Sequence, residues 1–329
     1  MDRTKEFLDL YHNSFALGDI DPWVWLSQYI ADRMELNSDQ RCWFSFLQSV
    51  TYHLPTAYVI LNEYPDLELA GISRLREWWT PEVQKMLPFQ KDKLRQRKYL
   101  PETVESYKRV VRGSESSYFD SILSESPNEN FYILWDKFYK EVDHWGRFSC
   151  WNFGQGLKHI ASYPIEPDTL LLTLPGSDSH TKGLCHALGK DEWNFKRRWK
   201  DEEGKRKKES YKFSTKDREF LEAKAKSLML SISNRSYVDS FSMETVCCEF
   251  HKLYRKGNSR YVGYYNDRIA EDINSVMDNW PGVDWRPLME GRKELYDLDT
   301  IGIKVDKSKF KLTPEEKVYV ECYRDNSSS

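Results

Sequence analysis

Apolar residues recur along most of this chain at the three- and four-residue spacing of an amphipathic helix. In the segment 23–34, positions 23, 26, 30 and 34 are apolar, and the preceding Asp21-Pro22 supplies a capping residue and a first-turn proline. Thr80-Pro81 repeats this start signal. Strand-like alternation is confined to the short run Thr169–Leu174. The pattern therefore predicts an all-α fold.

The remaining segments with helical spacing mostly follow a proline or a capping residue; they are 38–50, 101–111, 131–142, 147–160, 215–232, 242–254, 260–277 and 285–296. We expect these helices to form a single large domain over 1–300, followed by a C-terminal extension over 301–329 with a disordered tail. Two polar stretches, 114–130 and 196–210, lack the spacing. We interpret them as loops, the second as a charged loop insertion.

Composition narrows the class of protein only in part. The 329 residues carry a net charge of −3, so only local basic clusters could indicate nucleic acid. No apolar run is long enough to span a membrane, and the six cysteines form no Cys-x-x-Cys pair. These features are typical of a soluble cytoplasmic protein with reduced thiols and no membrane partner. Cys247, Cys248 and His251 form a buried helix face more plausibly than a metal site, so we predict no metal ligands.

Polar groups gather at a proline-containing turn between two apolar helical segments. The turn reads Thr51-Tyr52-His53-Leu54-Pro55-Thr56, and Asn62-Glu63 follow within the same block. A helix that only packs in a core needs no more than an apolar stripe. The additional hydroxyl, imidazole and amide groups of this block suit a flat polar ligand such as a nucleobase. We predict base contacts from Tyr52, Thr56, Asn62 and Tyr264.

Basic residues form islands on this otherwise acidic chain. One island contains Lys93, Arg95, Arg97 and Lys98, and another lies within 196–208. Local positive charge of this kind suits a DNA backbone, although solubilising surface is an equally simple interpretation of either island.

A second set of cations suits an anion with several oxygens. Lys252, Arg255, Lys256 and Arg260 flank the turn between two predicted helices, and Arg147 follows Gly146 at the start of another. Guanidinium groups and first-turn backbone N–H groups both bind phosphates, so these residues could clamp a pyrophosphate. Ion pairs along the helices are the alternative interpretation.

Known catalytic motifs are missing from the sequence. It contains no P-loop, nucleophile elbow, kinase signature or His-Glu-x-x-His. The segment Leu174–Gly183 has a weak likeness to the helix-hairpin-helix of DNA glycosylases, which leaves a distant similarity to that fold open.

Several blocks, in order from about Leu8 to Tyr296, carry a resemblance to a known family; they are YIADRMELNSDQRCWFSFL, TYHLPTAY, NEYPD, RLREWW, VESYKRVV, WGRFSCWNF, GLCHALGKDEW, ETVCCEFHKLYRKGNSRYVGYYNDRI and VDWRPLMEGRKELYD. Together they resemble the amino acid:DNA transferases of bacteriophages with hypermodified thymine, also called α-glutamyl/putrescinyl-thymine pyrophosphorylases. The resemblance covers nearly the whole chain.

This resemblance implies an enzyme that acts on double-stranded DNA carrying pyrophosphorylated 5-hydroxymethyluracil in an infected bacterial cell. An amine from an amino acid or a polyamine would replace the pyrophosphate, with Mg²⁺ as a potential helper. The base would have to leave the stack, and the protonated amine would need a base before it could attack. The candidates for the catalytic base are Glu63, Glu244 and Asp267, with His53 behind them. Each carboxylate has the alternative role of pairing with a nearby arginine.

Two other interpretations of the function stay open at this stage. A DNA glycosylase would leave an abasic site, whereas a transferase would keep the glycosidic bond. A non-catalytic DNA-binding protein would bind DNA and leave its nucleosides unchanged. The residues do not determine which amine is used.

Overall fold

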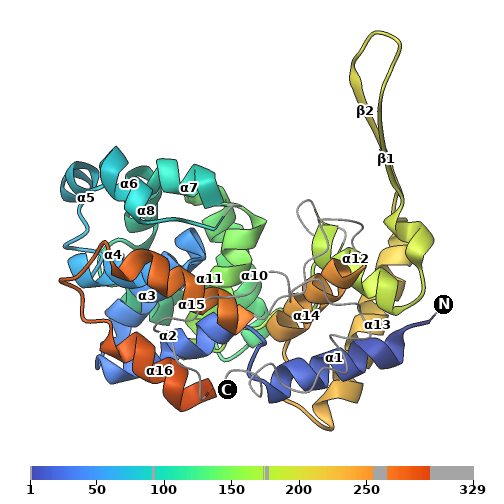
Figure 1. Ribbon diagram of the computed structural model, residues 1–329, viewed down its shortest axis with the longest axis horizontal. Coiled ribbons are helices and arrows are strands. Elements are labelled where there is room, and N and C mark those ends of the chain that lie inside the picture. The colour runs from blue at the N-terminus through green and yellow to red at the C-terminus, as the bar shows by residue number, and fades with distance from the viewer. Residues whose placement is uncertain (1, 91–92, 173, 175–177, 255–264, 297–329) are drawn as a thin grey trace. The chain divides into compact units, whose positions relative to one another are not determined.

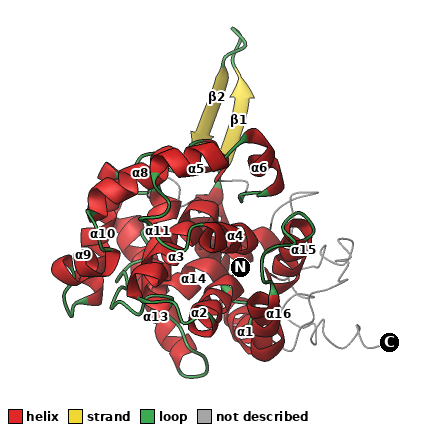
Figure 2. Cartoon of the chain, turned by 90° about the vertical axis from the view of Figure 1, so that its left-hand side faces the viewer, coloured by secondary structure: helices red, strands yellow, loops and turns green. Residues whose placement is uncertain are grey.

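The computed structural model describes residues 2–90, 93–172, 174, 178–254 and 265–296. Helices account for nearly all of its regular structure, so the predicted all-α class is confirmed (Figure 1; Figure 2). The described chain divides into two compact units. Unit 1 contains the described residues of 2–20 and 168–254, and unit 2 contains those of 21–167 and 265–296.

Unit 2 contains most of the helices, and their bounds are α2 Pro22–Arg33, α3 Ser38–Thr51, α4 Leu54–Glu63, α5 Ile72–Trp78, α6 Pro81–Met86, α7 Leu94–Lys98, α8 Leu100–Val111, α9 Glu115–Ile122, α10 Pro127–Glu141, α11 Arg147–His159, α15 Tyr265–Met277 and α16 Arg286–Tyr296. The central helix is α3, because every residue from Cys42 to Thr51 is buried. It begins where the sequence predicts, with Asn37 and Gln40 forming a capping box.

Aromatic rings fill the space around α3. Phe46 stacks on Tyr107 at a centroid distance of 3.9 Å and on Trp145 at 5.3 Å, and Phe153 meets it edge-on at 6.2 Å. These rings come from α3, α8, α11 and the turn before α11. Large flat side chains therefore fix the position of the α11 N-terminus against α3.

Unit 1 contains α1 Thr4–Ala16, α12 Asp178–Ala187, the short 3-10 helix η2 Asp191–Asn194, the strands β1 Lys196–Lys200 and β2 Arg206–Ser210, α13 Thr215–Ser233 and α14 Ser240–Leu253. Its tightest contact joins α12 to α14. A Cβ atom added to Gly183 would lie 1.7 Å from the carbonyl oxygen of Cys247, a distance that no side chain can tolerate. Glycine at this position lets the two helix backbones touch.

The charged insertion 196–210 is not a loop, and this prediction was wrong. Its two halves pair as an antiparallel hairpin, with Lys196 opposite Ser210 and Lys200 opposite Arg206 (Figure 2). The Asp201 side chain accepts hydrogen bonds from the backbone N–H groups of Glu203 and Lys205 and closes the turn. The turn chemistry around Gly204, whose φ is +75°, overrides the charge pattern.

Two other segments also differ from their prediction. Thr169–Leu174 forms no strand over its described residues, since the N–H groups of Leu170 and Leu172 bond to the Glu222 carboxylate rather than to another strand. The segment 114–130 contains α9, where Ser114 caps the helix. Patterning missed α9 because it is only two turns long. The predicted extension 301–329 lies outside the described residues.

The α12–α14 contact yields a stability prediction. Gly183→Ala should destabilise the protein by at least about 3 kcal/mol, because its methyl group would overlap the Cys247 carbonyl and force the helices apart. Urea unfolding would measure the change. Gly282→Ala, where an added Cβ meets no atom within 4 Å, should stay within about 0.5 kcal/mol of the natural protein. Equal losses in both variants would contradict the close packing.

A second prediction concerns Glu115, which is buried with its Oε1 accepting a hydrogen bond from the Tyr107 hydroxyl. Burial raises the pKa of Glu115 well above its ordinary value. A raised folded-state pKa adds stability that is complete below the unfolded pKa and lost as the pH rises. Between about pH 5 and about pH 8, Glu115→Gln should therefore gain stability relative to the natural protein in urea unfolding. Glu125→Gln, at an exposed position, should keep a constant difference across that range.

Candidate active site

The α11 N-terminus in unit 2 carries a buried cation in a position where an anion could bind. The side chain of Lys93 is 1% exposed, and its Nζ donates to Ser149 Oγ at 2.7 Å. The ammonium also lies 4.5 Å from the ring centroid of Phe148. A buried ammonium costs several kcal/mol of desolvation. The position of the Lys93 ammonium beside the first turn of α11 therefore requires a structural or functional reason.

Arg147 adds a guanidinium at the same helix end. Its side chain is 7% exposed, and its Cζ lies 5.4 Å from the Trp151 ring centroid. Gly146 precedes the helix and offers no side-chain cap, and an added Cβ there would meet no atom within 4 Å. A helix N-terminus presents backbone N–H groups and a positive dipole end. The end of α11 therefore combines two buried cations with oriented donors, and open space lies beside Gly146.

The polar turn between α3 and α4 packs beside this helix end through aromatic rings. Tyr52 meets Phe148 edge-on at 4.8 Å and Trp23 at 5.5 Å. The segment before α7 joins the same turn, since the backbone N–H of Gln90 donates to Thr51 O and that of Lys93 donates to Gln90 O. These bonds place the turn and the buried ammonium in one cluster. We call Tyr52, His53, Thr56, Lys93, Arg147, Phe148, Ser149 and Asp272 the α11 cluster.

His53 orders this turn. Its side chain caps α4, with Nδ1 3.3 Å from the backbone nitrogen of Thr56 and 2.9 Å from Thr56 Oγ1. Its Nε2 lies 3.4 Å from Asp272 Oδ1 on α15. Since both ring nitrogens have partners, His53 suits a positioning role better than the predicted role of base. Asp272, with a side chain 29% exposed, is the carboxylate that His53 orients.

The thiol at this helix end, Cys150, is buried and poorly suited to act as a nucleophile. Burial raises the pKa of the Cys150 thiol to about 12, even though Lys93 and Arg147 oppose that effect. A thiol with such a pKa is not a nucleophile at neutral pH.

The predicted pyrophosphate set is brought together only in part. Arg147 lies in the α11 cluster of unit 2, whereas Lys252 lies on α14 of unit 1. Arg255, Lys256 and Arg260 lie outside the described residues.

The predicted bases are also distributed over both units. Glu63 is exposed at the end of α4, and Glu244 is buried on α14 with Oε1 2.9 Å from His180 Nδ1. Asp267 belongs to α15, but its side chain lies outside the described part of the structure. The base candidates were chosen by residue type, which carries no information on which helix faces meet.

The predicted base-binding residues are not placed so that they could all contact one edge of a nucleobase. Thr56 lies in the first turn of α4 and donates its hydroxyl to Pro88 O, while Asn62 lies in the last turn and donates to Tyr58 O. Six residues of helix separate them by about 9 Å along the axis. Tyr52 and Thr56 belong to the α11 cluster, and Tyr264 lies outside the described residues.

The predicted DNA-backbone set needs one correction. Lys93 does not belong to the exposed basic surface of α7 that could face a DNA backbone, because its ammonium lies inside the α11 cluster. Arg95 and Lys98 are exposed on α7, and Arg97 donates to Gln84 O. Gln96 of the same helix donates to His144 O at 2.9 Å, which places α7 beside the turn that leads into α11.

Sequence reasoning missed Asp272, Ser149 and Arg268, whose guanidinium donates to Gln90 Oε1. The i,i+4 spacing of Arg268 and Asp272 was a usable signal, because it places both on one face of α15. The Mg²⁺ ion expected from pyrophosphate chemistry stays a prediction.

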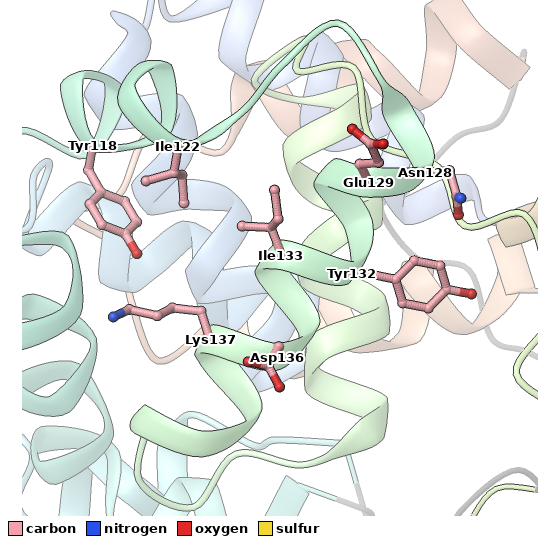
Figure 3. Close-up of a pocket in the computed structure, with 8 residues that line it drawn as sticks. All are labelled: Tyr118, Ile122, Asn128, Glu129, Tyr132, Ile133, Asp136 and Lys137. Carbon is pink, nitrogen blue, oxygen red and sulfur yellow. The ribbon is translucent and has the colours of Figure 1, made fainter.

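A pocket of about 780 Å³ lies on a different part of unit 2 (Figure 3). Figure 3 shows Tyr118 and Ile122 from α9 on one side, with Ile133 and Lys137 of α10 extending toward them. The charged side chains that line it are Glu129, Asp136 and Lys137, so carboxylates outnumber cations. This composition does not suit a pyrophosphate, and we do not assign the reaction to it.

None of the described helices combines the length and the apolar character needed to cross a membrane.

The chain is similar in sequence to known proteins. The family described as amino acid:DNA transferase matches residues 18–259. A protein of Salmonella phage ViI named serinyltransferase is 24% identical over 275 residues, which cover 80% of this chain and 65% of the relative. The chain thus spans less than two thirds of that relative's length. No solved structure matches the chain.

The exposed cations of α7 provide a test of DNA contact. Replacing Arg95 and Lys98 with Ala should weaken binding to duplex DNA and lower the slope of log K against log salt by about 2, because each phosphate contact contributes about 0.9. Fluorescence anisotropy over a salt series would measure this slope.

The matched control replaces Lys137 and Lys140, which are also exposed in unit 2 but pair with Glu141 at 2.7 Å and Asp136 at 2.5 Å. Its slope should equal that of the natural protein. Equal slopes for both double variants would exclude α7 from the DNA interface.

Proposed function

This chain belongs to the amino acid:DNA transferase family, and we propose that it joins the amino group of an amino acid to a pyrophosphate-activated thymine base in DNA. The single observation that supports a site for this reaction is the α11 N-terminus, where Lys93, Arg147 and the helix dipole offer positive charge to one anion. Lys93, Arg147 and Ser149 all lie inside the region that the family matches.

The proposed substrate is 5-hydroxymethyluracil whose hydroxyl carries a pyrophosphate. The neutral amine nitrogen attacks the exocyclic methylene carbon with its lone pair and forms the C–N bond. The C–O bond breaks, and its electron pair leaves with the pyrophosphate oxygen. The amine loses a proton to a base of the enzyme before the attack and a second proton as the product forms, and both pass to water. No oxidant or reductant is consumed.

Lys93 and Arg147 would stabilise the charge that grows on the leaving oxygen. Cations held in place before the reaction need no reorganisation, and charge is screened less in a buried site than in water. Lys93 is held by Ser149 and by the Phe148 ring, so its ammonium is already oriented toward the first turn of α11. This arrangement acts more strongly on the transition state than on the ground state, which is the requirement for catalysis.

Asp272 is the proposed base for the amine. A carboxylate must accept the proton of an ammonium group, and the Asp272 carboxylate is partly exposed while His53 holds one oxygen. Tyr52 and Phe148 are rings beside the same site, and a thymine-derived base leaving the duplex could stack on them. Asp272 lies beyond the residues that the family matches, so this assignment rests on geometry alone.

The amine donor is proposed to be an amino acid, with serine the first to test because of the relative's name. Glycine and putrescine are the alternative donors. A glycosylase activity and non-catalytic DNA binding are the alternative functions. The product distinguishes these two functions. A glycosylase leaves an abasic site, whereas a protein that only binds DNA leaves the nucleoside unchanged.

The test is mass spectrometry of nucleosides after the full-length protein is incubated with activated duplex DNA and each amine, with and without Mg²⁺. We expect a nucleoside that has gained the amine and released one pyrophosphate per transfer. Abasic DNA would indicate a glycosylase, and an unchanged nucleoside mass with every donor would exclude a transferase.

The site assignment is tested separately with Lys93→Met. We expect at least about a 100-fold lower rate of transfer, as for the loss of one transition-state donor. Its thermal stability should be unchanged or higher, because replacing a buried charge by an apolar chain of similar length often costs nothing. The control Lys140→Met, on α10, should transfer at the natural rate. If Lys93→Met keeps full activity in a protein that transfers, the site is wrong while the function stands.

A further inference from the structure

Three metal-ligating side chains meet in unit 1, and none of them takes part in the proposed reaction. They are His180 on α12 and Glu244 and Cys248 on α14. One ligand atom from each lies within 4.8 Å of the other two. From this geometry we propose that His180, Glu244 and Cys248 form a zinc site.

The close crossing of α12 and α14 creates this cluster. The two helices lie side by side, and Gly183 touches the Cys247 carbonyl in a way that any side chain would prevent (Figure 1). On α12, His180 lies one turn before Gly183. On α14, Cys247 lies between Glu244 and Cys248 in the sequence. Because the backbones approach so closely at Gly183, the imidazole of one helix reaches ligands of the other.

Spacing on α14 supplies the other half of the geometry. Glu244 and Cys248 are four residues apart, so both side chains lie on one face of the helix. His180 Nδ1 lies 2.9 Å from Glu244 Oε1. In a tetrahedral zinc site, neighbouring ligand atoms lie about 3.5 Å apart, given bonds of about 2.0–2.3 Å. Side-chain rotations that move the three ligand atoms by about an ångström would therefore let them hold one ion.

The ligand set selects the kind of metal. Imidazole nitrogen, thiolate sulfur and carboxylate oxygen together suit zinc, whereas magnesium takes oxygen ligands. The site is thus chemically different from a Mg²⁺ ion carried by pyrophosphate. Three protein ligands leave the fourth tetrahedral position for water or for an oxygen of a bound molecule.

Burial gives a reason for a cation at this place. His180 is 1% exposed and Glu244 is 7% exposed. Buried carboxylates are costly unless a cation or hydrogen bonds compensate them.

The sequence did not reveal this set. Its candidate was the group Cys247, Cys248 and His251, yet His251 stacks with His186 at a centroid distance of 5.6 Å. The partner of Cys248 is instead His180, which is 68 positions away along the chain. Only the helix crossing brings the two together.

The experiment measures zinc in the full-length protein by mass spectrometry and zinc affinity by competition with a chromophoric chelator. We expect about one zinc ion per chain, and at least about tenfold weaker binding in Cys248→Ser and in His180→Gln. Cobalt substitution should show a thiolate-to-metal charge-transfer band that Cys248→Ser lacks. The readout is independent of DNA modification, so its failure and that of the proposed transfer are distinguishable.

The matched controls are Cys185→Ala and His12→Gln, a cysteine and a histidine of unit 1 outside the cluster. Both should bind zinc as the natural protein does. Should His180→Gln fail to fold, Cys248→Ser carries the test, because this thiol is only partly buried. A natural protein without zinc affinity at micromolar concentration, or a folded Cys248→Ser with unchanged affinity, would overturn the site.

Discussion

The burial of the Lys93 ammonium beneath the first turn of α11 constrains the rest of unit 2. A charge that is 1% exposed remains there only if surrounding groups replace its water, and the Ser149 hydroxyl and the Phe148 ring do so. The chain leading to Lys93 must therefore be fixed as well. Gln90 bonds to the end of α3, and Pro88 accepts the hydroxyl of Thr56 at the start of α4. One buried cation thus connects the α3–α4 turn to the end of α11.

The aromatic core gives this arrangement its rigidity. Phe46 on α3 stacks on Tyr107 and Trp145, and Trp145 immediately precedes the Gly146 that opens α11. Stacked rings have few alternative packings, so the helix end is held to within a narrow range of positions. A site that stabilises a leaving anion requires this kind of preorganisation. The high aromatic content of the chain, 15%, is therefore used largely as a scaffold.

The two units bury their polar groups for different reasons. In unit 2 the buried charge is a cation at a helix end, which suits an anionic leaving group. In unit 1 the buried Glu244 carboxylate lies beside a histidine and a thiol, which suits a cation. Glu244 was a candidate base for the amine, but its pairing with His180 places it in the second setting. The chemistry of a carboxylate is thus decided by its neighbours rather than by its position in a sequence block.

The sequence by itself determined the fold class and the bounds of α2, α3, α8, α11 and α16 to within one residue, because apolar spacing, Asn37 and the helix-starting prolines act locally. It also identified the α3–α4 turn and the Gly146-Arg147 helix start as chemically unusual. Only the tertiary structure decided that Lys93 is a buried cation rather than a surface contact, and that Asp272 joins His53 across more than 200 residues. The hairpin over 196–210 depended on a local turn closed by Asp201, which the charge pattern did not reveal. Local signals report which element forms, but which side chains meet depends on how closely helices approach, and at Gly183 that approach is set by the absence of a single methyl group.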